Sequence, residues 1–406
     1  MMSLGQFFLF CVLSCNIALG QTYKVLYSFG SSGSKDGIEP LSTLVADESG
    51  NLYGTTLVGG LGLGTIFELS PNADGTWSET VLYSLCDDEI YCFDGAFPSG
   101  LTRDPQGNLY GTTYADAAFG GGEAFELSPP TTQNGPWTYI PLYEFPPQNW
   151  PNALTLDTSG NLYGTAFAGG SGKGQAGYVF ELDPSNFAFS VLYNFCSTGN
   201  GNFCPDGAYP ISDLVFDKEG NLWGSTSTGG RQGSQGTGTV FKLSPSGEGW
   251  AETAVYPFPL VSGGSEYNVT YPEGPLSMDR VGNIYGTFTN EVIHNNYSGA
   301  FTLDPKGANA HATWFTADGG MSYSGVLIDA SRPFSFVAAT DSNGGSVLQL
   351  GRTGKQTVLH RFCQQPNCTD GNEPAGGLYE DKSGNLYGTT EAGGAYDQGV
   401  VYEITP

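Results

Sequence analysis

The chain has 406 residues, with 14 Lys and Arg against 40 Asp and Glu, which gives a formal net charge of −26. So acidic a surface repels phosphate backbones and anionic lipid, which argues against nucleic acid as a partner and leaves cationic ligands, divalent ions and neutral glycans. The 61 Gly and 24 Pro recur at fixed turn positions, so they indicate turn chemistry rather than a disordered chain.

Residues 1–20 differ from the rest of the chain. Phe7–Ala18 is a mainly apolar run that is too short to cross a bilayer, and Ala18-Leu19-Gly20 is typical of a signal-peptide cleavage site. The usual positively charged start is missing, and a lipoprotein box ending at Cys15 is the alternative. We expect a signal peptide over 1–20 and a secreted protein over 21–406, with no transmembrane segment and no C-terminal anchor.

Six copies of a phrase close to Gly-Asn-Leu-Tyr-Gly-Thr organise the remainder. They begin at Gly50, Gly107, Gly160, Gly220, Gly282 and Gly384. Successive copies lie 53 to 62 residues apart, except for a double gap before the last copy. A period of this length means that one supersecondary unit is repeated.

Each unit contains four short runs of alternating apolar residues, which is typical of β-strands. In the first unit they are Leu41–Asp47, Asn51–Thr56, Thr65–Ser70 and Thr80–Leu85. Asp-x-x-Gly-Asn separates the first two runs and predicts a tight hairpin, because Asp bonds turn amides and Gly-Asn tolerates positive φ. The third run ends in Ser-Pro or Asp-Pro in most units, since Pro cannot donate to a strand ladder.

A seventh, degenerate unit fills the double gap. Its runs are 325–329, 334–340, 346–351 and 356–362, and they keep the strand rhythm without the Gly-Asn turn. Seven antiparallel four-stranded units predict an all-β fold, a seven-bladed β-propeller. Lys24–Phe29 is a fourth strand without a first, and Val401–Thr405 is a third strand without a fourth. The N-terminal strand should therefore close the last blade, whereas an open β-solenoid leaves that strand unexplained.

Six of the eight cysteines form local pairs, and each pair follows a fourth strand. The pairs are Cys86 with Cys92, Cys196 with Cys204, and Cys363 with Cys368. Metal ligation is the competing interpretation, but no pair shows Cys-x-x-Cys or a neighbouring His. We expect three disulfides that hold loops in shape in an oxidising compartment.

One face of the predicted disc carries the variable connections, namely the loops between second and third strands and the disulfide loops that lead to the next blade. Function concentrates on variable loops held by a rigid scaffold. The pattern Asp-Gly-x-x-Pro recurs there before four first strands, and a ring of such carboxylates could bind Ca²⁺. A plain structural turn is the alternative. The candidate ligand-binding residues at the channel mouth are Asp36, Glu39, Asp94, Asp206, Glu273, Asp370, Glu373, Tyr91 and Trp150.

Aromatic residues in the same loops could stack on sugar rings. Several of them directly precede a proline, which favours a packing role at blade junctions instead; they are Phe97, Trp150, Tyr209 and Tyr271. The chain has three His, at 294, 311 and 360, and no Gly-x-Ser-x-Gly or His-Glu-x-x-His motif. His360 occupies a fourth-strand position that is Tyr in most units. A two-carboxylate glycosidase stays open, although no pair is selected.

The unit Leu-Tyr-x-Phe, Asp-x-x-Gly-Asn-Leu-Tyr-Gly-Thr-Thr, Gly-Gly and Val-Phe-Glu-Leu-Ser-Pro resembles the GloVer-type tandem repeat of exported bacterial proteins. Leu52–Thr56 with Phe67–Pro71 carries the resemblance, as does Leu386–Thr390. It implies an extracytoplasmic protein. Members often carry a C-terminal surface-sorting signal, which is not seen here. More distantly the pattern is similar to NHL-type propellers, an analogy of fold alone.

These features favour a secreted binding or interaction module for a polysaccharide or protein, more than an enzyme. The alternatives are a propeller-type glycoside hydrolase or lyase and a structural repeat protein of the cell envelope. No resident cofactor is expected apart from the calcium hypothesis. The ligand and the oligomeric state do not follow from the sequence.

Overall fold

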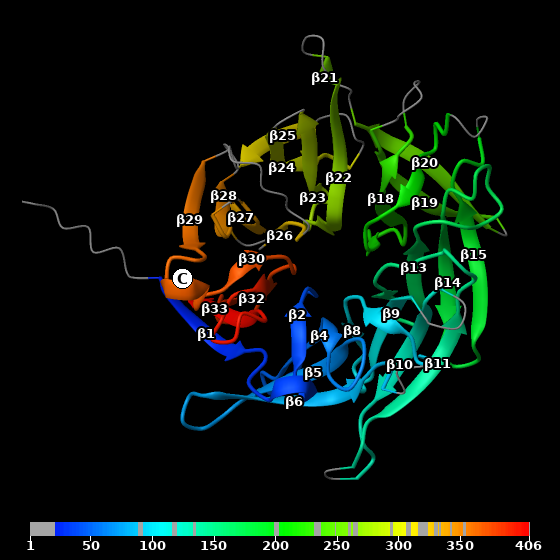
Figure 1. Ribbon diagram of the computed structural model, residues 1–406. Coiled ribbons are helices and arrows are strands. Elements are labelled where there is room, and N and C mark those ends of the chain that lie inside the picture. The colour runs from blue at the N-terminus through cyan, green and yellow to red at the C-terminus, as the bar shows by residue number, and fades with distance from the viewer. Residues whose placement is uncertain are drawn as a thin grey trace, which may run out of the picture.

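A computed structural model describes the chain over residues 21–87, 92–115, 120–132, 135–198, 203–230, 237–247, 249–258, 261–262, 267–292, 295–305, 310–315, 324–328, 332, 334–341, 343–351 and 355–405. Seven antiparallel sheets, the blades, stand around a central axis, and in every blade except the fifth the shortest strands are innermost (Figure 1). The seven-bladed β-propeller predicted from the repeats is therefore confirmed.

The blades follow one another in chain order. Blade 1 holds β2 (Gly37–Pro40), β3 (Val45–Ala46), β4 (Leu52–Gly59), β5 (Thr65–Pro71) and β6 (Trp77–Ser84). Blade 2 holds β7 (Ala96–Pro98), β8 (Thr102–Arg103), β9 (Leu109–Ala115), β10 (Glu123–Ser128) and β11 (Thr138–Glu144). Blade 3 holds β12 (Thr155–Leu156), β13 (Leu162–Ala166), β14 (Tyr178–Asp183) and β15 (Ala188–Asn194). Blade 4 holds β16 (Ala208–Pro210), β17 (Val215–Phe216), β18 (Leu222–Thr228), β19 (Thr239–Ser246) and β20 (Gly249–Pro257).

The remaining blades depart further from the repeat or combine the two ends of the chain. Blade 5 holds β21 (Val261–Ser262), β22 (Tyr267–Met278), β23 (Ile284–Val292), β24 (Asn295–Leu303) and β25 (Ala310–Phe315). Blade 6, the degenerate unit, holds β26 (Leu327–Ile328), β27 (Phe334–Ala339), β28 (Ser346–Gly351) and β29 (Gln356–Arg361). Blade 7 holds β30 (Asn372–Pro374), β31 (Tyr379–Glu380), β32 (Leu386–Ala392), β33 (Val400–Thr405) and the N-terminal β1 (Thr22–Ser28).

The two ends of the chain meet in blade 7, where β1 runs antiparallel to β33 with Val25 opposite Tyr402. Figure 1 shows these strands side by side at the edge of the ring. In the part of the chain that the structure describes, the helical elements are two short 3₁₀ turns, η1 (Gly33–Lys35) and η2 (Pro366–Cys368). Within the described residues, no helix is long and apolar enough to cross a membrane.

The repeated Asp-x-x-Gly-Asn turn is held by its own aspartate. In blade 1, Asp47 Oδ1 accepts hydrogen bonds from the amides of Ser49 and Asn51 at 2.8 and 2.9 Å. Its Oδ2 accepts from Asn51 Nδ2 at 2.9 Å and from Tyr53 Oη at 3.2 Å. The same carboxylate thus shapes the hairpin and fixes the phrase's tyrosine between blades. This arrangement explains why those residue types recur together.

The glycine of the phrase allows close packing inside each blade. A Cβ at Gly54 would lie 2.7 Å from Phe67 Cζ and 2.9 Å from Leu44 Cδ2. Phe67 is fully buried, and its equivalents in blades 2 to 4 are Phe125, Phe180 and Phe241. The apolar core consists of such side chains packed between the faces of neighbouring blades, so each blade is stabilised by the next.

The innermost strand differs from the predicted Leu41–Asp47. It consists of two short pieces, β2 and β3, which both pair with β4. Pro40 offers no amide to the ladder, and Ser42 Oγ, rather than a backbone oxygen, accepts the hydrogen bond from Thr55 N at 2.9 Å. The Asp-Gly-x-x-Pro motif therefore forms part of the inner strand instead of preceding it.

Candidate binding site at the inner end of the blades

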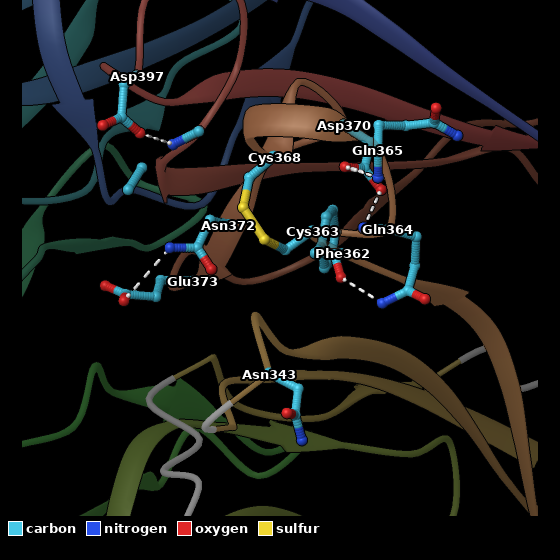
Figure 2. Close-up of a disulfide and its surroundings, with 12 residues drawn as sticks. Asn343, Phe362, Cys363, Gln364, Gln365, Cys368, Asp370, Asn372, Glu373 and Asp397 are labelled. Carbon is cyan, nitrogen blue, oxygen red and sulfur yellow. Dashed lines mark hydrogen bonds between the residues drawn. A yellow bond between two sulfur atoms is a disulfide. The ribbon is translucent and has the colours of Figure 1, made fainter.

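The loops that lead from the outer strand of one blade to the inner strand of the next are closed by disulfides in three places. The bonds join Cys86 to Cys92, Cys196 to Cys204, and Cys363 to Cys368, so all three predicted pairs are confirmed. Figure 2 shows the third of them beside Asn372 and Glu373 at the start of β30. Each disulfide therefore lies just before an innermost strand.

The motif aspartates lie beneath these loops. A tyrosine of the preceding outer strand donates a hydrogen bond to the carboxylate in three cases: Tyr27 to Asp36 at 2.9 Å, Tyr83 to Asp94 at 2.9 Å, and Tyr193 to Asp206 at 2.8 Å. Loop amides add further bonds, such as Cys86 N to Asp94 Oδ1 at 2.9 Å. These contacts give the aspartates a structural role as loop anchors. A ligand contact by them stays a prediction.

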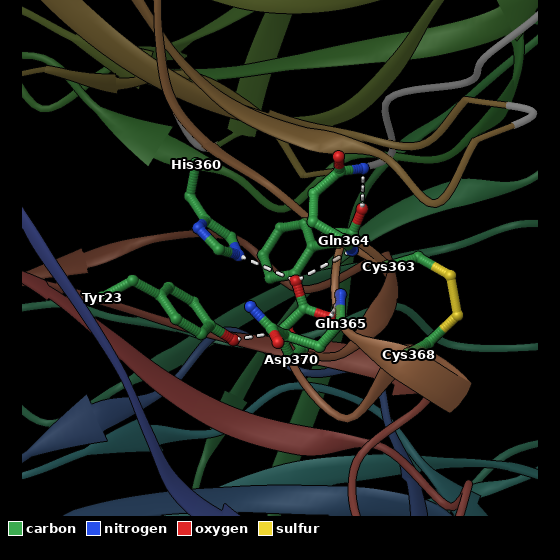
Figure 3. Close-up of polar contacts among 8 residues, drawn as sticks. Tyr23, His360, Cys363, Gln364, Gln365, Cys368 and Asp370 are labelled. Carbon is green, nitrogen blue, oxygen red and sulfur yellow. Dashed lines mark hydrogen bonds and ion pairs between the residues drawn. A yellow bond between two sulfur atoms is a disulfide. The ribbon is translucent and has the colours of Figure 1, made fainter.

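The fourth junction replaces tyrosine with His360 (Figure 3). Its Nε2 lies 3.6 Å from Asp370 Oδ2, and its ring stacks on Tyr23 with centroids 3.6 Å apart. The Tyr23 hydroxyl donates to the main-chain oxygen of Asp370 at 2.6 Å. Burial lowers the pKa of His360, and the Asp370 carboxylate opposes that shift. The three residues line an outer groove of about 640 Å³ between blades 6 and 7.

Two positions per repeat face each other where the inner strand meets the second strand. In the six blades that carry the repeated phrase, one is the residue before the proline that pairs with the second strand, and the other is the third residue after the second glycine of the phrase, the equivalent of Gly54. In blade 2, Ala96 pairs with Ala115 and Pro98 with Thr113, which sets Phe97 opposite Tyr114. We call these residues the inner belt; they are Glu39, Leu57, Phe97, Tyr114, Trp150, Phe167, Tyr209, Ser227, Tyr271, Thr289, Glu373 and Glu391.

The belt lies at the end of the blades that carries the disulfide loops, as expected from the connectivity. Its inner-strand members adopt an unusual backbone: φ is positive at Glu39, Phe97, Trp150, Tyr209 and Glu373, between 47° and 60°. Non-glycine residues rarely adopt this conformation, and it persists only where the surroundings enforce it. Here the surroundings are the neighbouring blade, because the amide of each of four of these residues donates to a carbonyl of the preceding blade. One such bond joins Tyr209 N to Ala176 O at 2.7 Å.

The belt is aromatic over blades 2 to 4. Tyr114 and Trp150 stack with centroids 5.7 Å apart and planes 4° apart, although they belong to different blades. Phe167 continues the run, 6.1 Å from Trp150 and 5.1 Å from Tyr209. Tyr114 is 51% exposed, and the other three are partly exposed. We call these four residues the aromatic arc.

The belt is acidic where blade 7 meets blade 1. Glu373 and Glu391 occupy the two positions of blade 7, and Glu39 follows in blade 1. Burial raises the pKa of Glu391, and the charges of Glu373 and Glu39 raise it further. The three carboxyl groups, the acidic arc, are therefore close enough to interact. The belt thus presents two chemically different sectors.

Three of the predicted site residues lie on the belt: Glu39, Trp150 and Glu373. Glu273 is buried and accepts a hydrogen bond from Thr289 Oγ1 at 2.7 Å, and Tyr91 lies outside the described residues. Sequence reasoning missed Tyr114, Phe167 and Glu391. Their signal was available, because each stands at a variable position two residues after the repeated phrase.

Among the residues that the structure describes, no three His, Cys, Asp or Glu side chains cluster in a way that could hold a metal ion. The acidic arc is no exception. Calcium at the mouth of the ring, raised by the sequence, stays a prediction.

The Gloeobacter/Verrucomicrobia repeat matches residues 133–346 of the chain, and no curated protein matches. Similar solved structures include an oligogalacturonate lyase in complex with manganese, with a TM-score of 0.54 at 10% identity over 95% of this chain and 96% of that one. A polysaccharide lyase has a TM-score of 0.52 at 11% identity, covering 94% and 92% of the two chains. The periplasmic gluconolactonase of Pseudomonas aeruginosa reaches 0.50 at 14% identity, over 79% and 84%. At such low identity these similarities concern the fold alone.

Proposed function

The chain belongs to the Gloeobacter/Verrucomicrobia repeat family, and we propose that it is an extracytoplasmic binding module whose inner belt binds a neutral or cationic glycan. The aromatic arc is the observation that carries this proposal. Four rings from three blades form one partly exposed run, and Tyr and Trp combine an apolar face with a polar group. Sugar rings present the matching combination of apolar faces and hydroxyls.

The acidic arc supports the same ligand class. Ionised carboxylates accept hydrogen bonds, so Glu39, Glu373 and Glu391 suit the hydroxyl or ammonium groups of a glycan. The net charge of −26 disfavours polyanionic chains. The disulfides support an oxidising compartment outside the cytoplasm.

Rigidity of the belt favours binding further. The positive φ values and inter-blade hydrogen bonds hold the belt backbone in place before a ligand arrives. A preorganised site avoids part of the ordering cost of association. The scaffold therefore suits selective binding by side chains that differ from blade to blade.

The test is glycan binding by Trp150→Ala, measured by calorimetry or affinity electrophoresis against neutral, amino-substituted and uronic acid polysaccharides. Loss of a central aromatic anchor costs about 2 kcal/mol, so we expect about a thirty-fold weaker Kd for the bound glycan. The control is Phe187→Ala, because Phe187 is 54% exposed in the β14–β15 turn at the opposite end of the blade.

Equal loss in both variants, or tighter binding of uronic acid chains than of neutral ones, would contradict the proposal. Shortening of the glycan during the assay would instead identify a hydrolase or lyase. A panel that binds nothing would favour a structural role in the envelope.

A further inference from the structure

At two blade junctions a partly buried glutamate lies near a buried aspartate, at equivalent places. At the junction of blades 7 and 1, Glu79 on β6 interacts electrostatically with the loop anchor Asp36. At the junction of blades 3 and 4, Glu252 on β20 interacts in the same way with Asp206. Both glutamates stand four residues before the position of the outer-strand tyrosine in their own blade. Neither pair belongs to the inner belt.

The hydrogen bonds around the first pair are incomplete. Asp36 is fully buried, and its Oδ2 accepts from Tyr27, Ser31 and the amide of Ser32 at 2.9, 3.3 and 3.2 Å. Its Oδ1 is also buried but accepts no hydrogen bond from the described residues, and the same holds for Glu79 Oε1. Two buried acceptors without a donor are costly unless something positive lies between them.

The second pair has similar neighbours, except that Asp206 Oδ1 accepts a hydrogen bond from Thr198 Oγ1 at 3.2 Å. Tyr193 donates to Asp206 Oδ2 at 2.8 Å, and Ser197 adds its amide at 2.8 Å and its hydroxyl at 2.9 Å. Glu252 Oε1 is again buried without a donor among the described residues. A glutamate oxygen without a donor therefore lies near the loop aspartate at both junctions, so the arrangement is not peculiar to one loop.

At two other junctions the position of this glutamate is occupied by a tyrosine, whose hydroxyl is a hydrogen-bond donor. Between blades 1 and 2 the glutamate is replaced by Tyr139, whose hydroxyl lies 2.7 Å from Glu123 Oε1 and 2.9 Å from the main-chain oxygen of Asp94 and donates its one proton to either acceptor. Between blades 6 and 7 it is replaced by Tyr23, which donates to the main-chain oxygen of Asp370 at 2.6 Å. A phenol at this position is a donor, whereas an ionised glutamate can only accept. A protonated glutamate restores the donor.

We propose that Glu79 and Glu252 each bind a proton at neutral pH and donate it to the neighbouring aspartate, so that two acid pairs fasten the loops before blades 1 and 4. One proton satisfies both orphaned oxygens of the first pair, Asp36 Oδ1 and Glu79 Oε1. On ionisation, two negative charges face each other beneath each loop, and the loop anchors repel. Each pair therefore stabilises its loop only while its glutamate is protonated.

The electrostatics agree with this geometry. Burial, and secondly the charge of Asp36, raises the pKa of Glu79 to about 7. Burial, and secondly the charge of Asp206, raises the pKa of Glu252 to about 8. The other titratable groups that act on the pairs are Tyr27 and Tyr193, and burial raises the pKa of both tyrosines above their usual value. They therefore stay neutral hydrogen-bond donors in this pH range.

The sign of the pH effect follows from these shifts. Above their ordinary pKa the glutamates are ionised in the unfolded chain but protonated in the fold, so unfolding releases two protons. Stability from these pairs is complete in acid and is lost as the pH rises through about 7 and 8. Each released proton raises the unfolding equilibrium constant about tenfold per pH unit between the ordinary glutamate pKa of 4.5 and the raised pKa in the fold, and adds nothing above the raised value.

The test compares the wild type with Glu79→Gln and Glu252→Gln in urea denaturation from pH 5 to 9. An amide imitates the protonated carboxyl, so the variants should match the wild type near pH 5 and exceed it at pH 9. The ratio of unfolding constants should grow up to about tenfold per pH unit for each substitution, and about a hundredfold for both. The exposed Glu48→Gln is the control and should change nothing.

Infrared spectroscopy gives a second readout that does not depend on unfolding. The carbonyl band of protonated carboxyl groups should be present at pH 6, shrink by pH 9, and weaken in each Gln variant. Unchanged pH dependence in the double variant, or absence of that band, would overturn the proposal. Stabilisation of the wild type by added Ca²⁺ that disappears in Glu79→Gln would also overturn it, because a cation would then occupy the pair.

Discussion

The substitution His360→Tyr tests whether the outer-strand tyrosine fastens each loop. His360 stands where blades 1, 3 and 7 have Tyr83, Tyr193 and Tyr27. Those tyrosines donate to aspartates at 2.8 to 2.9 Å, whereas His360 Nε2 lies 3.6 Å from Asp370 and makes no hydrogen bond with the described residues. Tyrosine should therefore gain a bond that the native chain lacks at this junction.

The gain in the free energy of unfolding can be estimated from the hydrogen bond that tyrosine would add. A hydrogen bond to a charged group contributes about 1.5–3 kcal/mol, and partial exposure reduces this, so we expect about 1 kcal/mol at pH 7. The new ring has room, since Tyr83 already stacks on Tyr139 with centroids 4.7 Å apart in the equivalent junction. The variant would reproduce that junction with Tyr23 in place of Tyr139.

The pH dependence gives the sharper readout. Burial lowers the pKa of His360 in the fold, against the opposing charge of Asp370. The unfolded chain therefore takes up a proton near pH 6.5 that the folded chain resists, and stability is lost as the pH falls through about 6.5. His360→Tyr should remove this loss, so its advantage should grow between pH 7 and pH 5.

The assay is urea denaturation followed by tyrosine and tryptophan fluorescence at both pH values. The reciprocal variant Tyr83→His is the matched control and should lose about 1 kcal/mol at pH 7 and become acid-sensitive. A neutral or destabilised His360→Tyr together with an unaffected Tyr83→His would refute the view that these side chains fasten the loops.

Three further substitutions test other parts of the scaffold. Asp157→Ala removes a carboxylate that accepts hydrogen bonds from two turn amides, and it should lower the free energy of unfolding by about 2 kcal/mol in urea denaturation. An unchanged midpoint would show that the turn forms without these hydrogen bonds. Gly111→Ala places a Cβ 2.7 Å from Phe125 Cζ and should cost about 1–3 kcal/mol, which a thermal melt would detect as a lower Tm. Replacing Cys196 and Cys204 together by Ser should cost about 2 kcal/mol, measured against the wild type with and without reductant, and reductant should destabilise the wild type more than the variant, which keeps the other two disulfides.

The repeat made the fold predictable because its fixed residues act within one blade. The Asp47 turn, the close packing at Gly54 and the Cys86–Cys92 disulfide all join residues near each other in the chain. Local pattern and spacing therefore indicated strand number, blade number and disulfides. The blade that lost the phrase was still recognised from its strand rhythm.

The details that the sequence did not predict depend on contacts between blades. The inner strand is interrupted after Pro40, where Ser42 Oγ replaces a backbone acceptor, and the amide of Glu39 donates to Gln398 of the preceding blade. The stack of Tyr114 on Trp150 and the pair of Asp36 with Glu79 join neighbouring blades as well. Such contacts follow from how blades are placed, which no periodicity within one unit specifies.

The difference between contacts within a blade and contacts between blades also explains how this scaffold can carry different ligand sites. Where the Asp-Gly-x-x-Pro motif occurs, its proline packs on a glycine of the preceding blade, as Pro210 does on Gly177, and its aspartate holds the strand entry. The residue before the proline, Tyr209 in this blade, is held by its backbone amide, and its ring also packs on Phe167 of the preceding blade. Because the main-chain hydrogen bond does not depend on the side chain, belt positions can vary in chemistry while the inner strand stays in place. This freedom accounts for one ring of equivalent positions that is aromatic over three blades and acidic where the chain closes.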